Sequence, residues 1–247
     1  MGDRLRQGLP DTFVLWDVDH TLIEYGGVSK ETYVLAFERL TGQTPATRPV
    51  THGRTDFQIM CELLAANGVA VDGYTSIADF EAVLIAAMKL KAPELPERGH
   101  VVAGVVDALQ ALRNQMGVIQ SVLTGNIAPN AFAKLSAFGL DKWVDLKVGG
   151  FGSDDEVRLN LVGVARRKLA ERYGKVFDRS STVLIGDTLL DVQAARDGGA
   201  KVIAVATGVH EFDKLAGCGA DATLHDLSNL DNFLATLVRV RTQDTAV

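Results

Sequence analysis

The stretch Thr12–Leu22, with the sequence TFVLWDVDHTL, places the strongest constraint on what this chain can fold into. Its first residues are apolar or β-favouring without a break, which is typical of a strand buried on both faces of a parallel sheet. Asp17 and Asp19 then follow where such a strand would end. Like charges at close range repel each other, so packing gives no reason for the pair. Either a bound Mg²⁺ or an ordinary turn after the strand would explain the two acids.

Composition narrows the class of protein. The chain has 247 residues, of which 47% are hydrophobic and 23% are charged, as in ordinary globular proteins. Its formal net charge of −6 argues against nucleic acid or an anionic membrane as a partner. Cys61 and Cys218 form no C-x-x-C pair, and the polar residues 1–11 contain no apolar signal core. We therefore expect a cytoplasmic protein with reduced thiols and no membrane span.

Residues 24–100 differ from the rest of the chain because three helical patterns follow one another with no strand between them. We expect these helices to begin near Ser29, Asp56 and Ser76, which are residue types that favour helix N-termini. An all-helical insert of this kind predicts a separate small domain, which we call the cap.

The remaining residues, 1–23 and 101–247, alternate between strand and helix patterns and are expected to form the catalytic core. Strands separated by single helices predict right-handed crossovers and a parallel sheet, so the expected fold class is α/β. Within this part we expect a short strand at Leu146–Val148. A helix should follow from Ser153 to about Tyr173, with a capping box at its start.

Polar groups recur where the predicted strands end. Thr124 ends the strand that begins at Val118, and Asp187 and Asp191 follow the strand Thr182–Ile185. In an open parallel sheet these ends form one crevice, so four acids and a hydroxyl should converge there. Each group alone has an ordinary alternative role as a turn or cap residue.

Three motifs in this order resemble those of the haloacid dehalogenase superfamily of phosphohydrolases: Asp17-Val18-Asp19-His20-Thr21, Thr124-Gly125-Asn126 and Gly186-Asp187-Thr188-Leu189-Leu190-Asp191. The resemblance extends from Phe13 to about Gly208. The helical insert is similar to the cap of the superfamily's phosphoglycolate phosphatase and β-phosphoglucomutase branch. The resemblance implies a Rossmann-like core with a helical lid.

The resemblance also implies a role for each motif residue. Asp17 would attack phosphorus to give an aspartyl-phosphate, and Asp19 would act as acid toward the leaving alcohol and then as base toward water. Mg²⁺ would bind the Asp17 carboxylate, the Asp19 backbone carbonyl and Asp187. The remaining implied roles are phosphoryl or substrate binding by Thr124, Gly125 and Asn126, and support by Thr21, Thr188 and Asp191.

The acid at Asp19 favours phosphoryl transfer, because dehalogenases of this superfamily typically lack an acid two residues beyond the nucleophile. The implied substrate is a small phosphorylated metabolite, with phosphoglycolate as the first candidate. A sugar phosphomutase stays open, since it needs the same acid pair. A receiver-like phospho-aspartate module is the alternative from another class, although receivers are about half this length and lack the insert. The sequence indicates no oligomeric state.

Relatives also present a cation between the threonine motif and the last acidic motif, and two residues compete for that role here. Lys147 lies in the predicted short strand, whereas Arg158 follows a glycine-rich loop. We favour Arg158, because a guanidinium can bridge a phosphoryl oxygen and a carboxylate. Its alternative role is an exposed ion pair with the preceding acids, and we expect Arg158→Ala to change stability by less than about 1 kcal/mol.

Arg54 stands in the turn Thr51-His52-Gly53-Arg54 before a cap helix. A glycine beside an arginine at a helix start can present a guanidinium and free amides to an anion. We expect Arg54 to contact the distal part of the substrate, unless the turn is only an exposed capping loop.

Overall fold

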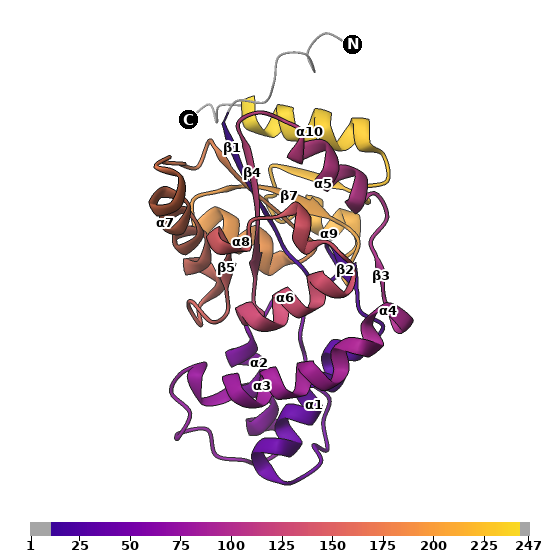
Figure 1. The fold of residues 1–247 in the computed structure, drawn as a ribbon, viewed down its shortest axis with the longest axis vertical. Helices are drawn as coiled ribbons and strands as arrows, with labels where there is room; N and C mark the ends of the chain where they lie inside the picture. Colours follow the sequence, from indigo (N-terminus) through magenta and orange to yellow (C-terminus); the bar gives the residue numbers. More distant parts are fainter. Residues whose placement is uncertain (1–10, 243–247) are drawn as a thin grey trace.

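The computed structural model describes residues 11–242, so expectations for residues 1–10 and 243–247 lie outside it. Six strands form one sheet in the order β5-β4-β1-β6-β7-β8, and every neighbouring pair is parallel. In that order the strands are Gly150–Phe151, Val118–Thr124, Thr12–Trp16, Thr182–Gly186, Lys201–Val205 and Ala222–Leu224. The predicted parallel sheet is confirmed, and β1 lies inside it between β4 and β6 (Figure 1).

Helices cover both faces of the sheet (Figure 1). Alternate residues of β1 point to opposite faces, so Val14 and Trp16 enter one hydrophobic cluster while Phe13 and Leu15 enter another. The helices of the first cluster are α5 (Val105–Arg113), α6 (Ala128–Ala137) and α10 (Leu230–Thr242). Those of the second are α7 (Leu161–Tyr173), α8 (Leu189–Asp197) and α9 (Phe212–Ala216). The α/β fold class predicted from the sequence is therefore confirmed.

The remaining α-helices form a lobe beyond the carboxyl ends of the strands, in indigo and purple in Figure 1. They are α1 (Val28–Thr41), α2 (Asp56–Ala66), α3 (Ala78–Lys91), the 3₁₀ turn η1 (Ala92–Glu94) and α4 (Leu95–Arg98). Phe37, Leu64 and Phe80 belong to a hydrophobic cluster contributed mainly by α1, α2 and α3. This segment corresponds to the predicted cap. We call it the helical lobe and keep 24–100 as its proposed bounds.

Two short strands join the helical lobe to the sheet. The strand β2 (Ile23–Glu24) leads into the lobe and β3 (His100–Val101) leads out, and the two pair antiparallel. The chain thus enters and leaves the lobe side by side, through these two paired strands. Among residues 11–242, no helix combines the length and apolar character needed to cross a lipid bilayer.

The three helices of the lobe begin close to the predicted positions, but their capping residues differ from the predictions. Gly27 precedes α1 with φ of 84°, and the Ser29 side chain makes no cap there. Thr55 caps α2 through a capping box with Gln58, so the prediction of Asp56 as the cap is wrong. Asp56 follows the cap and is left to contact the core. The third start is close to the prediction, since α3 begins at Ala78.

The predicted strand Leu146–Val148 is also wrong. These residues form a 3₁₀ turn, η3, because the Asp145 side chain accepts a hydrogen bond from the backbone N–H of Lys147. The edge strand comes just after it as β5. Glycine is needed at position 150, since a Cβ there would lie 2.6 Å from the Leu161 carbonyl oxygen.

The predicted helix start at Ser153 is wrong for a related reason. Polar side chains of this segment bind other backbone groups, because the Ser153 hydroxyl accepts from the N–H of Ala128 and Asp154 accepts from the N–H of Phe151. The helix α7 begins only at Leu161, after the 3₁₀ turn η4 that starts at Arg158. Arg158 therefore lies in a tight turn rather than in the second turn of a helix.

Candidate active site

The carboxyl ends of β1, β4 and β6 lie next to one another at the end of the sheet that faces the helical lobe. Asp17 directly follows β1, Thr124 ends β4, and Asp187 directly follows β6. A pocket opens between this edge and the lobe, and Tyr25, Tyr33 and neighbouring lobe residues close it from the other side. These predicted site residues line it: Asp17, Asp19, Arg54, Thr124, Gly125, Asn126, Arg158 and Thr188.

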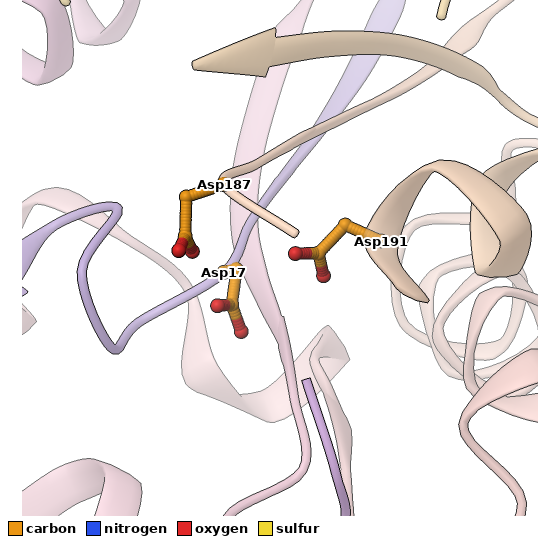
Figure 2. Close-up of side chains that lie close together, drawn as sticks. All are labelled: Asp17, Asp187 and Asp191. Atoms are coloured by element: carbon orange, nitrogen blue, oxygen red, sulfur yellow. The ribbon is translucent and has the colours of Figure 1, made fainter. Parts of the chain in front are cut away.

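Three carboxylates gather at the base of the site. Oxygens of Asp17, Asp187 and Asp191 lie within 4.8 Å of one another, and Figure 2 shows the three side chains converging. Burial, opposed by Arg158 and reinforced by neighbouring carboxylates, raises the pKa of Asp17 to about 7. Burial and the charges of Asp191 and Asp17 raise the pKa of Asp187 well above its usual range. The cluster thus holds more negative charge than its protein partners neutralise.

The Asp187 side chain shows that this cluster fits a divalent cation. Its Oδ1 accepts a hydrogen bond from Thr21 at 3.1 Å, whereas its buried Oδ2 has no hydrogen-bond partner in the described part of the chain. Glycine at 208 allows this close packing, because a Cβ there would lie 1.8 Å from Oδ2. An unpartnered carboxylate oxygen beside two other acids is a suitable ligand for Mg²⁺. The supporting role of Thr21 stays a prediction.

Arg158 is the cation of this cluster. Its Nη2 donates to Oδ1 of Asp17 at 2.8 Å and to Oδ1 of Asp191 at 2.5 Å. Only 7% of Arg158 is exposed, so its alternative role in an exposed ion pair is wrong, and the small stability effect expected of a surface substitution no longer applies. Asp191 also accepts from the N–H and hydroxyl of Thr188, which completes a capping box at the start of α8. Lys147 is exposed and lies outside the pocket lining.

Thr124 and Asn126 link the second motif to the first. The Thr124 hydroxyl oxygen accepts hydrogen bonds from the side-chain amide of Asn126 at 2.7 Å and from its backbone N–H at 3.3 Å. The hydroxyl hydrogen of Thr124 is therefore available to donate to a ligand. The same Asn126 amide donates to Oδ2 of Asp19 at 2.9 Å. Asn126 thus orients both Thr124 and Asp19.

The turn that carries Arg54 packs directly on the second motif. A Cβ on Gly125 would lie 2.0 Å from the Arg54 carbonyl oxygen, so glycine is required at this contact. The backbone N–H of Asp56 donates to the Gly125 carbonyl at 2.8 Å. Arg54 lines the pocket, and its Nε donates to Glu62 at 2.9 Å. Contact between Arg54 and a substrate stays a prediction.

Sequence reasoning missed Lys134. This lysine of α6 is fully buried, and its Nζ donates to both carboxylate oxygens of Asp19, at 2.8 and 2.7 Å. A signal was present, because Lys134 lies three residues after Ala131 and next to Leu135, on the buried stripe of its helix. A lysine on such a stripe is almost never fully buried unless it is paired.

Asp56 was assigned only as a helix cap, yet it joins the lobe to the core. Its side chain accepts hydrogen bonds from the Tyr33 hydroxyl at 2.6 Å and from the backbone N–H of Ile127 at 2.8 Å. Burial raises its pKa to about 6 despite these hydrogen bonds. Ile127 follows the second motif directly, so Asp56 ties the lobe to the loop that carries Thr124.

One family of known proteins matches most of this chain. The family model described as haloacid dehalogenase-like hydrolase matches residues 14–196. The chain belongs to this family. As a haloacid dehalogenase-like hydrolase it is an enzyme, and its match spans all three motifs of the site. That assignment favours a hydrolase over the receiver-like alternative.

Individual relatives of this haloacid dehalogenase-like hydrolase include a curated protein and two solved structures. "Probable phosphatase IndB" of Dickeya dadantii is 25% identical over 207 residues, covering 82% of this chain and 84% of the relative. A candidate β-phosphoglucomutase of Bacteroides vulgatus has a TM-score of 0.64 at 18% identity, with 96% and 93% coverage. A predicted phosphoglycolate phosphatase of Haemophilus somnus has a TM-score of 0.62 at 15% identity, with 91% and 98% coverage. The two structures show that the fold is shared over more than nine-tenths of the chain.

Proposed function

We propose that this haloacid dehalogenase-like hydrolase is a Mg²⁺-dependent phosphatase that hydrolyses a small phosphorylated metabolite through an aspartyl-phosphate on Asp17. The observation that carries the proposal is the pairing of Asp17 and Asp19 in one pocket with Arg158 and Thr124. Two acids with separate partners suit two roles. Asp17 lies against the Arg158 guanidinium, whereas Asp19 lies against Lys134 and Asn126.

In the first step an Asp17 carboxylate oxygen attacks phosphorus, and the bond from phosphorus to the ester oxygen breaks. The Asp19 carboxyl group gives its proton to that oxygen, so the product leaves as a neutral alcohol. In the second step the Asp19 carboxylate takes a proton from water as the water oxygen attacks phosphorus. Inorganic phosphate leaves, and the Asp17 carboxylate is restored.

The residues around the nucleophile hold the phosphoryl group during both steps. The Thr124 hydroxyl donates to one phosphoryl oxygen, and the Arg158 guanidinium neutralises another while it orients Asp17. Asp17, Asp187 and the Asp19 backbone carbonyl would hold Mg²⁺, supported by Asp191. When bound, the ion offsets the charge of the carboxylates and of the phosphate.

The pocket favours a small substrate. The Arg54 turn packs against Gly125, and Tyr25 and Tyr33 line the same space, so the lobe covers the site closely. Phosphoglycolate is the first compound to assay, in keeping with the predicted phosphoglycolate phosphatase among the structural relatives. The free thiols Cys61 and Cys218 suit the proposed cytoplasmic setting.

A sugar phosphomutase is the second candidate, because it uses the same acid pair and a candidate β-phosphoglucomutase shares this fold. The two activities differ in the acceptor of the phosphoryl group, which is water in one case and a sugar phosphate in the other.

One screen tests both candidates. Purified protein is incubated with a panel of phosphorylated metabolites, with Mg²⁺ or with EDTA, and both inorganic phosphate and isomerised sugar phosphates are measured. We expect Mg²⁺-dependent phosphate release that is lost in Asp17→Asn. Interconversion of sugar phosphates without phosphate release would favour the mutase, and a lack of turnover on the whole panel would contradict both.

A further inference from the structure

Lys134 is the only lysine with no exposed surface in the described part of the chain, and it lies at the junction of three elements. It belongs to α6, the helix that follows the second motif. Besides Asp19, its Nζ donates to the Ser29 hydroxyl at 2.9 Å and to Oδ1 of Asn126 at 2.7 Å. It therefore contacts the first motif, the second motif and helix α1 of the lobe at once.

These contacts match the chemistry of an ammonium group. A lysine has three N–H donors, and Asp19, Ser29 and Asn126 supply three acceptor residues. Removing an ammonium from water is costly unless the charge is paired and its hydrogen bonds are made. Lys134 can therefore stay buried only while its partners hold their present positions.

These contacts fix the orientation of the Asp19 carboxylate. Its Oδ1 accepts from Lys134, and its Oδ2 accepts from both Lys134 and Asn126. The side chain is 25% exposed, so water alone would leave it free to rotate. The two reacting acids are thus oriented by different cations, Asp17 by Arg158 and Asp19 by Lys134.

We propose that Lys134 is a positioning residue that aims Asp19 at the ester oxygen of the substrate and, through Ser29, makes that aim depend on the placement of α1. The inference rests on the proposed phosphatase function, in which Asp19 gives a proton to the leaving alcohol. Lys134 does not line the pocket, so it acts on the substrate only through Asp19. A lobe displaced from the core takes Ser29 away from Lys134, which loosens the hold on Asp19.

Leaving-group dependence tests this role. An alkyl phosphate such as phosphoglycolate or glycerol phosphate needs a proton on its leaving oxygen, whereas acetyl phosphate releases a stable carboxylate anion. The parameter to compare is kcat/KM, because it reports the steps up to leaving-group departure. We expect Lys134→Met to lower kcat/KM by about 10- to 100-fold for the alkyl ester. This loss is part of the rate enhancement that general acid catalysis typically contributes. For acetyl phosphate we expect less than about a threefold change.

Two further variants separate positioning from folding. Lys134→Gln keeps an N–H donor near Asp19 and should recover part of the alkyl-ester activity. It also serves as the test if Lys134→Met does not fold. Lys201→Met is the matched control, because Lys201 is also buried but lies at the start of β7, at the opposite ends of the strands from the site. It should leave the ratio of the two kcat/KM values at the wild-type level.

A double-mutant cycle with Asp19→Asn completes the design. If Lys134 acts through Asp19, Lys134→Met should add less than about threefold to the loss already caused by Asp19→Asn on the alkyl ester. Equal losses on both substrates in Lys134→Met, or full additivity in the cycle, would overturn the positioning role. A wild-type protein inactive on alkyl phosphates and on acetyl phosphate would instead overturn the proposed function, and the positioning role with it.

Discussion

The Arg158 guanidinium and the Asp17 carboxylate form a buried ion pair, with Nη2 and Oδ1 separated by 2.8 Å and each side chain 7% exposed. The same nitrogen contacts Asp191, so one cation serves two carboxylates, and Asp187 remains beside them. Because this arrangement leaves excess negative charge in a buried site, the stability of the protein should depend on what neutralises that charge.

Replacement of Arg158 by alanine should therefore affect both turnover and stability. We expect kcat to fall by about 100-fold or more, as for loss of a group that stabilises transition-state charge. Two buried carboxylates would lose their partner, so the free energy of unfolding in EDTA should fall by about 3–5 kcal/mol. Mg²⁺ should restore part of that loss. Steady-state kinetics and chemical denaturation measure these effects.

Lys147→Ala is the matched control for Arg158, because Lys147 is exposed and lies outside the pocket. It should leave turnover unchanged and stability within about 0.5 kcal/mol of wild type. A larger kinetic effect in Lys147→Ala than in Arg158→Ala would transfer the phosphate-neutralising role to Lys147.

Asp17→Asn should lower turnover by more than about 10³-fold, because an amide is a poor nucleophile and the covalent step is lost. The amide matches the carboxylate in shape, so the fold should be retained. Release of inorganic phosphate is the measurement, with circular dichroism as the check on folding. Wild-type turnover in this variant would rule out Asp17 as the nucleophile.

Metal binding should be visible without any assay of activity. Mg²⁺ that binds only the folded protein stabilises it, by about 2.7 kcal/mol at a concentration 100 times its dissociation constant. The melting temperature of wild type should therefore rise with added Mg²⁺, whereas that of Asp187→Ala should not. Asp213→Ala, at an exposed acid of α9, should behave like wild type. Identical titration curves for wild type and Asp187→Ala would contradict the metal assignment.

Asp56 should give the protein a distinct pH dependence. Its folded pKa of about 6 lies above the usual 3.8, so the folded state holds the proton more tightly than the unfolded state. This contribution to stability is fully present below about pH 4 and is lost as the pH rises through about 6. Relative to Asp56→Asn, wild type should lose about 2 kcal/mol of stability between pH 4 and pH 7.

Urea denaturation of both proteins at each pH isolates this effect, because all other titrating groups are shared. The Tyr33 hydroxyl can either donate or accept, so the asparagine can keep a partner. A stability difference that does not change with pH would show that Asp56 keeps its ordinary pKa in the folded protein.

The central strand and its acids could be predicted from the sequence because their signal is local. An unbroken apolar run before Asp17, and another before Asp187, fixes both the strand and the place where it ends. The parallel arrangement then brings these ends together without any further information. Thr124 was found in the same way.

The roles of Lys134 and Asp56 were not predicted from the sequence, because they depend on partners far away in the chain. Nothing near Lys134 in the sequence shows that Asp19 and Ser29 will surround it, and nothing near Asp56 shows the Ile127 backbone. The segment after β4 failed for the opposite reason. Asp145 accepts a local hydrogen bond from the N–H of Lys147, and Asp154 accepts one from the N–H of Phe151. These bonds replaced the strand and the helix start that the pattern favoured.

The position of β1 inside the sheet also has a consequence for how the chain becomes active. Its neighbours are paired in the registers Thr12 with Val118 and Phe13 with Thr182, and the Arg158–Asp17 contact closes a separation of 141 residues. Closing such long loops costs conformational entropy before the stabilising contacts form, and this makes parallel strand pairing slow. Recovery of activity during refolding should therefore come late, after most of the helical signal has returned.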